Sequence, residues 1–250
     1  MIKKFFVTLV TCSIFLISCN SDDDSTNKET KIPIEERNAL DDEAIEQLLN
    51  DYYFDSTTGK LTKFDTITGN DDDAYPSLKS IAKKDDLGIW YAENPNHVGT
   101  GESIVSSDST SIYLSYKASF FVATNSTDYS RKYGYVQSYV TSSTNTGDGS
   151  ALKDPEFYYA TLTSTEISNG VKRENIELKN FAEGLKHFKT TDRAITDLYN
   201  FQGVIILPSR LAFARNKYYT GSSLTENSSY RDASFVINFE LPKIQKRTTD

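Results

Sequence analysis

Two segments near the C-terminus decide the fold: residues 203–207 read GVIIL, and residues 233–241 read ASFVINFEL. The first is a short, continuous apolar run. The second is rich in the β-branched and aromatic residues that are enriched in strands. Each segment therefore predicts a β-strand.

The β character of the chain begins upstream, at about Leu87. Sixteen tyrosines and fourteen phenylalanines also suit a β-rich protein. Helices are predicted where apolar residues recur at helical spacing, over 42–53, and where Asn180 and Glu183 have the spacing of a capping box, over 180–188. Further strands are predicted over 88–91, 111–122, 133–141 and 157–162. Antiparallel strands with two helices predict the α+β class.

The N-terminus predicts a secreted and lipid-anchored protein. Lys3 and Lys4 precede an apolar run over 5–17, which is the pattern of a signal peptide and is shorter than the ~20 residues of a membrane span. The sequence Leu16-Ile17-Ser18-Cys19 resembles a bacterial lipobox. That resemblance implies cleavage of a signal peptide over 1–18 and a lipid on Cys19, which anchors the chain in the cell envelope, at the outer membrane, facing the periplasm or the surface.

Composition divides the remaining chain. Residues 19–37 are polar and acidic and predict a flexible tether. A helical extension is predicted over 38–86, and the main domain over 87–246. The formal net charge of −8 gives the chain no electrostatic reason to bind nucleic acid.

The chain offers few groups for nucleophilic or metal chemistry. Of its two cysteines, Cys12 leaves with the signal peptide and Cys19 carries lipid, so no disulfide or catalytic thiol is expected. His97 and His187 are far apart in sequence and have no recognisable partner ligands. We therefore expect no metal and no cofactor.

Four segments, in order, resemble FKBP-type peptidyl-prolyl isomerases. Residues 112–118, IYLSYKA, resemble the Val-x-Val-x-Tyr-x-Gly strand of that family, and residues 181–185, FAEGL, its aromatic-x-Glu-Gly helix start. Residues 203–213, GVIILPSRLAF, resemble its strand followed by Ile-Pro-x-x-Leu-Ala-Tyr-Gly, and 233–241 its closing strand. The chain is also similar to lipid-anchored members found in Bacteroidetes, in which a helix precedes the domain.

The resemblance implies a fold in which an antiparallel half-barrel sheet wraps over a short helix and encloses an aromatic pocket. In that pocket, Phe181 matches the aromatic floor and Tyr116 the tyrosine of the inner strand. The backbone N–H of Leu178 matches the donor to the substrate carbonyl.

The same resemblance shows where this chain departs from the family. Phe213 stands where the family has tyrosine, Ala214 where it has glycine, and Ile237 where it most often has phenylalanine. No segment matches the Phe-Asp-Ser wall cleanly, and Asp128 is the nearest candidate.

The activity that the resemblance implies is cis–trans isomerisation of Xaa-Pro bonds, whose barrier is ~18–20 kcal/mol. A dry, apolar pocket favours the twisted amide over the more polar planar one and needs no nucleophile. The expected partners are proline-containing polypeptide clients, and the chain is expected to be a monomer. Two alternatives stay open: a non-catalytic binding or chaperone lipoprotein of the same fold, and a surface lipoprotein that stacks glycans on tyrosines and Trp90.

Overall fold

The structure, a computed structural model, describes residues 32–67, 69, 71–127, 132–134, 136–139, 151–196 and 200–248. Pro33–Asp250 form one compact unit, so the predicted extension over 38–86 and the main domain over 87–246 belong together. The predicted signal peptide, Cys19 and Asp128 lie outside the described residues.

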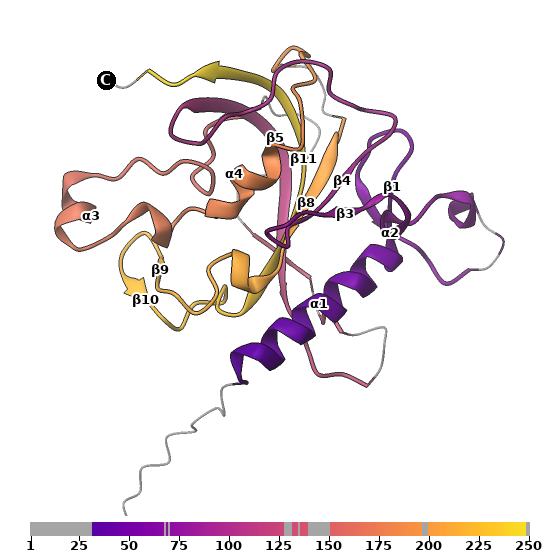
Figure 1. Cartoon of the computed structure of the whole chain (residues 1–250), viewed down its shortest axis with the longest axis horizontal. Helices are drawn as coiled ribbons and strands as arrows, with labels where there is room; N and C mark the ends of the chain where they lie inside the picture. Colours follow the sequence, from indigo (N-terminus) through magenta and orange to yellow (C-terminus); the bar gives the residue numbers. More distant parts are fainter. Residues whose placement is uncertain are drawn as a thin grey trace, which may run out of the picture. The chain divides into compact units, whose positions relative to one another are not determined.

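An antiparallel sheet of seven strands forms the centre of this unit (Figure 1). Its order is β3-β4-β8-β11-β5-β6, and β7 also pairs with β5. The strands are β3 (Lys83–Lys84), β4 (Trp90–Glu93), β5 (Thr110–Val122), β6 (Gln137–Ser138), β7 (Leu152–Lys153), β8 (Gly203–Leu207) and β11 (Ala233–Lys246). Together with the helices, this sheet confirms the α+β class.

The long strands β5 and β11 form the longest ladder of the sheet. Their pairing runs from Ala233 opposite Val122 to Lys246 opposite Thr110, with an irregularity between Glu240 and Lys243. Pro242 lies at this irregularity. Proline has no N–H to donate to a ladder, so the interruption falls where the sequence cannot continue regular pairing.

Helices and short hairpins surround the sheet. The α-helices are α1 (Ile34–Asp51), α2 (Leu78–Ile81), α3 (Ser164–Ser168) and α4 (Lys179–Leu185). Short 3-10 helices are η1 (Asp71–Ala74), η3 (Arg173–Asn175) and η4 (Ser209–Leu211). Two separate hairpins pair β1 (Tyr52–Phe54) with β2 (Leu61–Lys63), and β9 (Tyr218–Tyr219) with β10 (Leu224–Thr225). No helix in the described part of the chain is long and apolar enough to cross a membrane.

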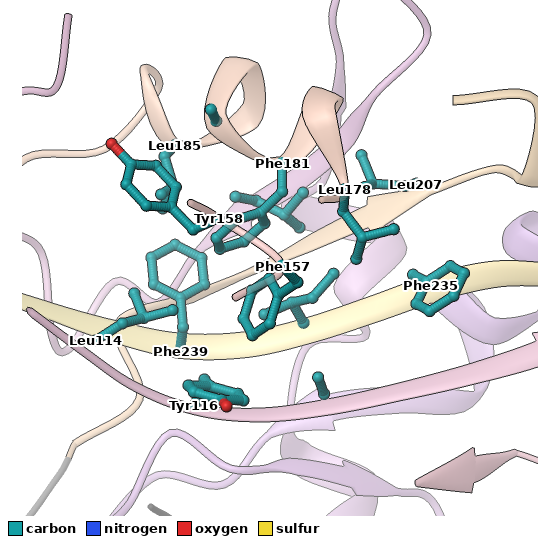
Figure 2. Packing of buried hydrophobic residues seen from close by; sticks show 14 of the residues in the cluster. Leu114, Tyr116, Phe157, Tyr158, Leu178, Phe181, Leu185, Leu207, Phe235 and Phe239 are labelled. Atoms are coloured by element: carbon teal, nitrogen blue, oxygen red, sulfur yellow. The ribbon is translucent and has the colours of Figure 1, made fainter. Parts of the chain in front are cut away.

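Helix α4 packs on one face of the sheet and closes the main hydrophobic core (Figure 2). Phe181 and Leu185 of α4 are fully buried there, with Phe239 of β11. Gly184 allows this close approach, because a Cβ at that position would lie 2.9 Å from the Ile205 side chain of β8.

Helix α1 lies on the opposite face of the sheet. Its residue Leu48 lines the same small cavity as Val236 of β11, on the side of the ladder away from α4. The Arg37 guanidinium donates a 2.6 Å hydrogen bond to the Ala123 carbonyl, and the Ser209 N–H donates a 3.0 Å bond to the Asp41 carboxylate. These bonds join α1 to the ends of β5 and β8.

The helices differ in detail from the sequence predictions. Helix α1 begins eight residues before the predicted start of 42 and inside the range 19–37 expected as a tether. Helix α4 begins after Leu178, so Asn180 is not its N-cap. Instead, the Asn180 side-chain amide donates a 2.7 Å hydrogen bond to the Leu211 carbonyl. A capping box joins Thr163 and Glu166 at the start of α3 instead.

Two predicted strands also differ. No strand covers 157–162, because the chain turns there: the N–H groups of Tyr158 and Tyr159 both donate to the Pro155 carbonyl. Of the strand predicted over 133–141, the described residues form only Gln137–Ser138. The aromatic residues in both segments predict strands. In the structure they lie on irregular backbone, and their rings are buried in contacts with other rings.

Asp41 makes the stability of this unit depend on pH. The residue is fully buried, and its second oxygen has no hydrogen-bond partner in the part of the chain described. Burial raises the pKa of Asp41 to about 6, and hydrogen bonds from Ser209 offset part of this effect. The folded chain thus holds this proton more tightly than the unfolded chain does, and the free energy of unfolding should fall as pH rises from about 4 to about 6.

We predict that Asp41→Asn stabilises the protein at pH 8 by as much as about 3 kcal/mol and changes little at pH 4. Asparagine keeps an acceptor for the Ser209 N–H and cannot ionise. Urea unfolding at the two pH values measures the difference. Asp42→Asn is the control, because Asp42 is half-exposed and paired with Arg210 at 2.8 Å. A gain for Asp41→Asn that is equal at both pH values would contradict the assignment.

Candidate functional site

A cavity of about 770 Å³ lies between the core face of β5, residues 152–157 and the β9–β10 hairpin. Five aromatic side chains form much of its wall: Tyr116, Tyr139, Phe157, Tyr218 and Tyr230. Its remaining wall residues are Ser138, Leu152, Lys153, Asp154, Pro155, Glu156, Ile176 and Thr220. We call this space the tyrosine cavity.

Edge-to-face contacts hold the rings of the tyrosine cavity in place. The ring centroids of Tyr139 and Tyr230 are 5.0 Å apart, and those of Tyr218 and Tyr230 are 4.7 Å apart. Tyr116 and Phe157 meet at 4.9 Å. Such pairs stabilise by about 0.5–1.5 kcal/mol each beyond the area that they bury. The cavity wall is therefore built from mutually packed rings that extend the hydrophobic core.

Tyr139, Tyr218 and Tyr230 remain neutral at physiological pH. Burial raises the pKa of Tyr139 well above its ordinary value and that of Tyr218 to about 12, and it also raises the pKa of Tyr230. A neutral phenol presents an apolar ring and a hydroxyl that can donate or accept a hydrogen bond. The site therefore combines apolar surface with a few polar groups, as ligand-binding cavities do.

Asp154, one of three charged residues in the described wall, has a structural role. Arg247 donates to both of its oxygens, at 2.8 and 3.1 Å, and Ser111 donates at 2.5 Å. Although burial opposes ionisation, these bonds bring the pKa of Asp154 below its ordinary value. The Arg247 guanidinium also stacks 3.5 Å from the ring centre of Tyr159. The end of β11 thereby fixes the segment that carries Phe157.

Of the five predicted pocket residues, only Tyr116 lines the tyrosine cavity. Phe181, Phe213 and Ile237 are buried and do not line it. All three belong to the hydrophobic core cluster, as Leu178 does. The structure therefore brings the five together in one core and leaves one of them at the cavity.

Phe157 separates α4 from the cavity. Figure 2 shows its ring between Phe181 and Leu178 on one side and Tyr116 on the other, and its ring centre is 5.2 Å from that of Phe181. The Leu178 N–H, which the resemblance assigns to the substrate carbonyl, donates a 2.8 Å hydrogen bond to the Phe157 carbonyl. Phe157 thus occupies the ring contact with Phe181 and accepts the Leu178 N–H, both of which the resemblance assigns to a ligand.

Sequence analysis missed most of the cavity wall. Tyr139 and Phe157 were interpreted only as strand residues, and no periodicity joins Tyr218 and Tyr230 to them. Asp128 lies outside the described residues, whereas Tyr139 lines the cavity, is buried and contacts Phe157 and Phe235. The one sequence feature that points to this cavity is the high tyrosine content, which does not show which tyrosines line it.

No group of three or more histidine, cysteine, aspartate or glutamate side chains that could hold a metal ion is found among the residues that the structure describes. No model of a known protein family matches the chain. No curated protein is significantly similar to it.

The link from η4 to the cavity contains a backbone conformation that favours glycine. Ala214 has φ of +51°, in the left-handed region. Its N–H donates to the Ser209 carbonyl at 3.0 Å, and its carbonyl accepts from the Asp232 N–H at 2.8 Å. These bonds keep the strained conformation in the segment that leads from Phe213 to Tyr218.

We predict that Ala214→Gly stabilises the protein by about 0.5 kcal/mol, because relief of the left-handed strain exceeds the added entropy of the unfolded chain. Ala182→Gly is the control: Ala182 lies inside helix α4, so glycine there should destabilise by about 1 kcal/mol. Thermal unfolding of both variants measures the two effects. Equal destabilisation of both would contradict this account of Ala214.

Proposed function

We propose that this chain is a lipid-anchored, FKBP-like protein of the cell envelope that binds proline-containing polypeptides in the tyrosine cavity. The observation that supports this most strongly is the cavity itself, with four tyrosines and a phenylalanine around about 770 Å³. Cavities of roughly 300–1,000 Å³ that are mostly apolar with a few polar groups are typical of ligand sites.

The chemistry of the wall suits proline. Proline-rich segments adopt an extended, preorganised conformation and bind in grooves lined by aromatic side chains. Tyrosine rings offer flat apolar surface to the pyrrolidine ring, and their hydroxyls can bond the backbone carbonyls of the peptide, which proline leaves without an internal partner.

The fold supports the FKBP-like part of the proposal. An antiparallel sheet covers the short helix α4, and the four segments of the resemblance occupy β5, α4, β8 with η4, and β11. Helix α1 precedes the sheet, as in the lipid-anchored relatives that the sequence resembles. We propose that this sheet and α4 form the half-barrel of that family.

Isomerisation of the bound Xaa-Pro bond is a second candidate function. The water-poor aromatic wall supports it, because such a wall disfavours the polar planar amide. The Leu178–Phe157 hydrogen bond weighs against it, because the donor expected to meet the substrate carbonyl is already used. Isomerisation would therefore depend on another donor, such as a tyrosine hydroxyl of the wall. This is why peptide binding is the primary proposal.

The glycan alternative finds less support. Trp90, the residue expected to stack on sugars, is only 8% exposed. The ammonium groups of Lys79 and Lys84 lie 4.7 and 5.3 Å from its ring centre. Little of its ring surface remains for a sugar.

Binding of a labelled Ala-Ala-Ala-Pro-Phe peptide to the full chain in detergent, followed by fluorescence anisotropy, tests the primary proposal. Tyr230→Ala should weaken binding at least tenfold, because it removes a half-buried wall ring. Tyr75→Ala is the matched control, since Tyr75 is also half-buried and stacks on Tyr53 away from the cavity. Equal loss in both variants, or equal binding of a peptide with alanine in place of proline, would contradict it.

A protease-free isomerisation assay on the same peptide separates the two candidates. Binding without acceleration above the uncatalysed rate would leave a binding protein. Acceleration that Tyr230→Ala removes and Tyr75→Ala retains would establish the enzyme.

A further inference from the structure

A second cavity, of about 230 Å³, adjoins the tyrosine cavity. The two share four wall residues: Glu156, Ile176, Tyr218 and Thr220. Glu166 of α3 and Tyr219 of β9 complete much of the smaller wall. Figure 1 shows α3 and the β9–β10 hairpin on the same side of α4. The two cavities are therefore neighbours that share one wall.

The smaller cavity is negatively charged. Glu156 stands on the shared wall, and no hydrogen bond or ion pair to its carboxylate is found in the described part of the chain. Glu166 accepts bonds of 2.7 and 2.8 Å from the N–H and hydroxyl of Thr163, and these bonds lower its pKa. The lowered pKa keeps the Glu166 carboxylate ionised at pH 7, and no lysine or arginine is among the described residues that line this cavity.

Aromatic surface accompanies this charge. The side chains of Tyr218 and Tyr219 line the smaller cavity beside the carboxylates. A site that combines carboxylates with tyrosine rings suits a cation on a long aliphatic stem, because the rings attract the charge and cover the stem.

We infer that the smaller cavity binds the side chain of a lysine or arginine close in sequence to the bound proline. This inference rests on the proposed function and names the substrate class: basic, proline-containing polypeptides. An extended peptide advances ~3.3 Å per residue, so a long side chain near the proline reaches a cavity that shares a wall with the proline site. The chain's own net charge of −8 favours the same basic partners.

The test compares labelled Ala-Ala-Xaa-Pro-Xbb-Ala peptides that carry lysine or norleucine at Xaa or at Xbb, with the full chain in detergent. Norleucine keeps the aliphatic stem of lysine without the charge. We expect lysine at one of these positions to bind about tenfold more tightly than norleucine at low salt, and the advantage to shrink as salt is added.

Two variants assign that advantage to the cavity. Glu156→Gln should reduce it to about twofold or less, because it removes the carboxylate of the shared wall and keeps the shape of the side chain. Glu102→Gln is the matched control: Glu102 is exposed and lines neither cavity. It makes the same change in net charge, and the lysine advantage should survive it.

The failures are distinguishable. Equal binding of lysine and norleucine peptides would overturn the inference and leave the proposed function standing. A lysine advantage that persists in Glu156→Gln would overturn it as well. If none of the peptides binds, both the proposed function and this inference are wrong.

Discussion

The antiparallel pairing of β5 with β11 is the constraint on which the rest of the structure depends. The two strands have 13 and 14 residues, and their ladder fixes which side chains face α4. Tyr116 and Phe239 are direct neighbours in this register. Since the side-chain period of a strand is two, a shift of one residue would turn this aromatic face toward α1 instead.

Aromatic packing on that face explains both the stability of the core and the character of the cavity. Phe157 enters from irregular backbone, meets Tyr116 and Phe181, and accepts the Leu178 N–H through its carbonyl. The same contacts fill the space under α4 and leave Tyr139, Tyr218 and Tyr230 to line the cavity, of which Tyr218 and Tyr230 are partly exposed. The same packed aromatic rings therefore belong to the hydrophobic core and form the wall of the candidate site.

The sequence predicted the parts of the fold that depend on local pattern. The strand over 203–207 has the predicted bounds, and β5 begins one residue before the predicted 111. The segment 203–207 is a short apolar run, and 111–122 alternates for part of its length and then becomes aromatic; both patterns are typical of strands. The α+β class follows from them.

Tertiary contacts decided what the sequence could not predict. Phe157 and Tyr139 have the residue types of strand formers, but their rings are placed by contacts with residues distant in sequence, such as Phe181 and Tyr230. Asparagine often caps helices, but the side-chain amide of Asn180 donates instead to the carbonyl of Leu211, 31 residues away. Of the five pocket residues that the resemblance predicted, only Tyr116 lines the cavity.

Intermolecular nuclear Overhauser effects between a proline-containing peptide and the tyrosine rings of the protein test the central claim most directly. The account predicts effects between the pyrrolidine protons and the rings of Tyr116, Tyr139, Tyr218 and Tyr230. Effects confined to Tyr52 and Leu61, which line the small cavity on the opposite face of the sheet, would contradict it.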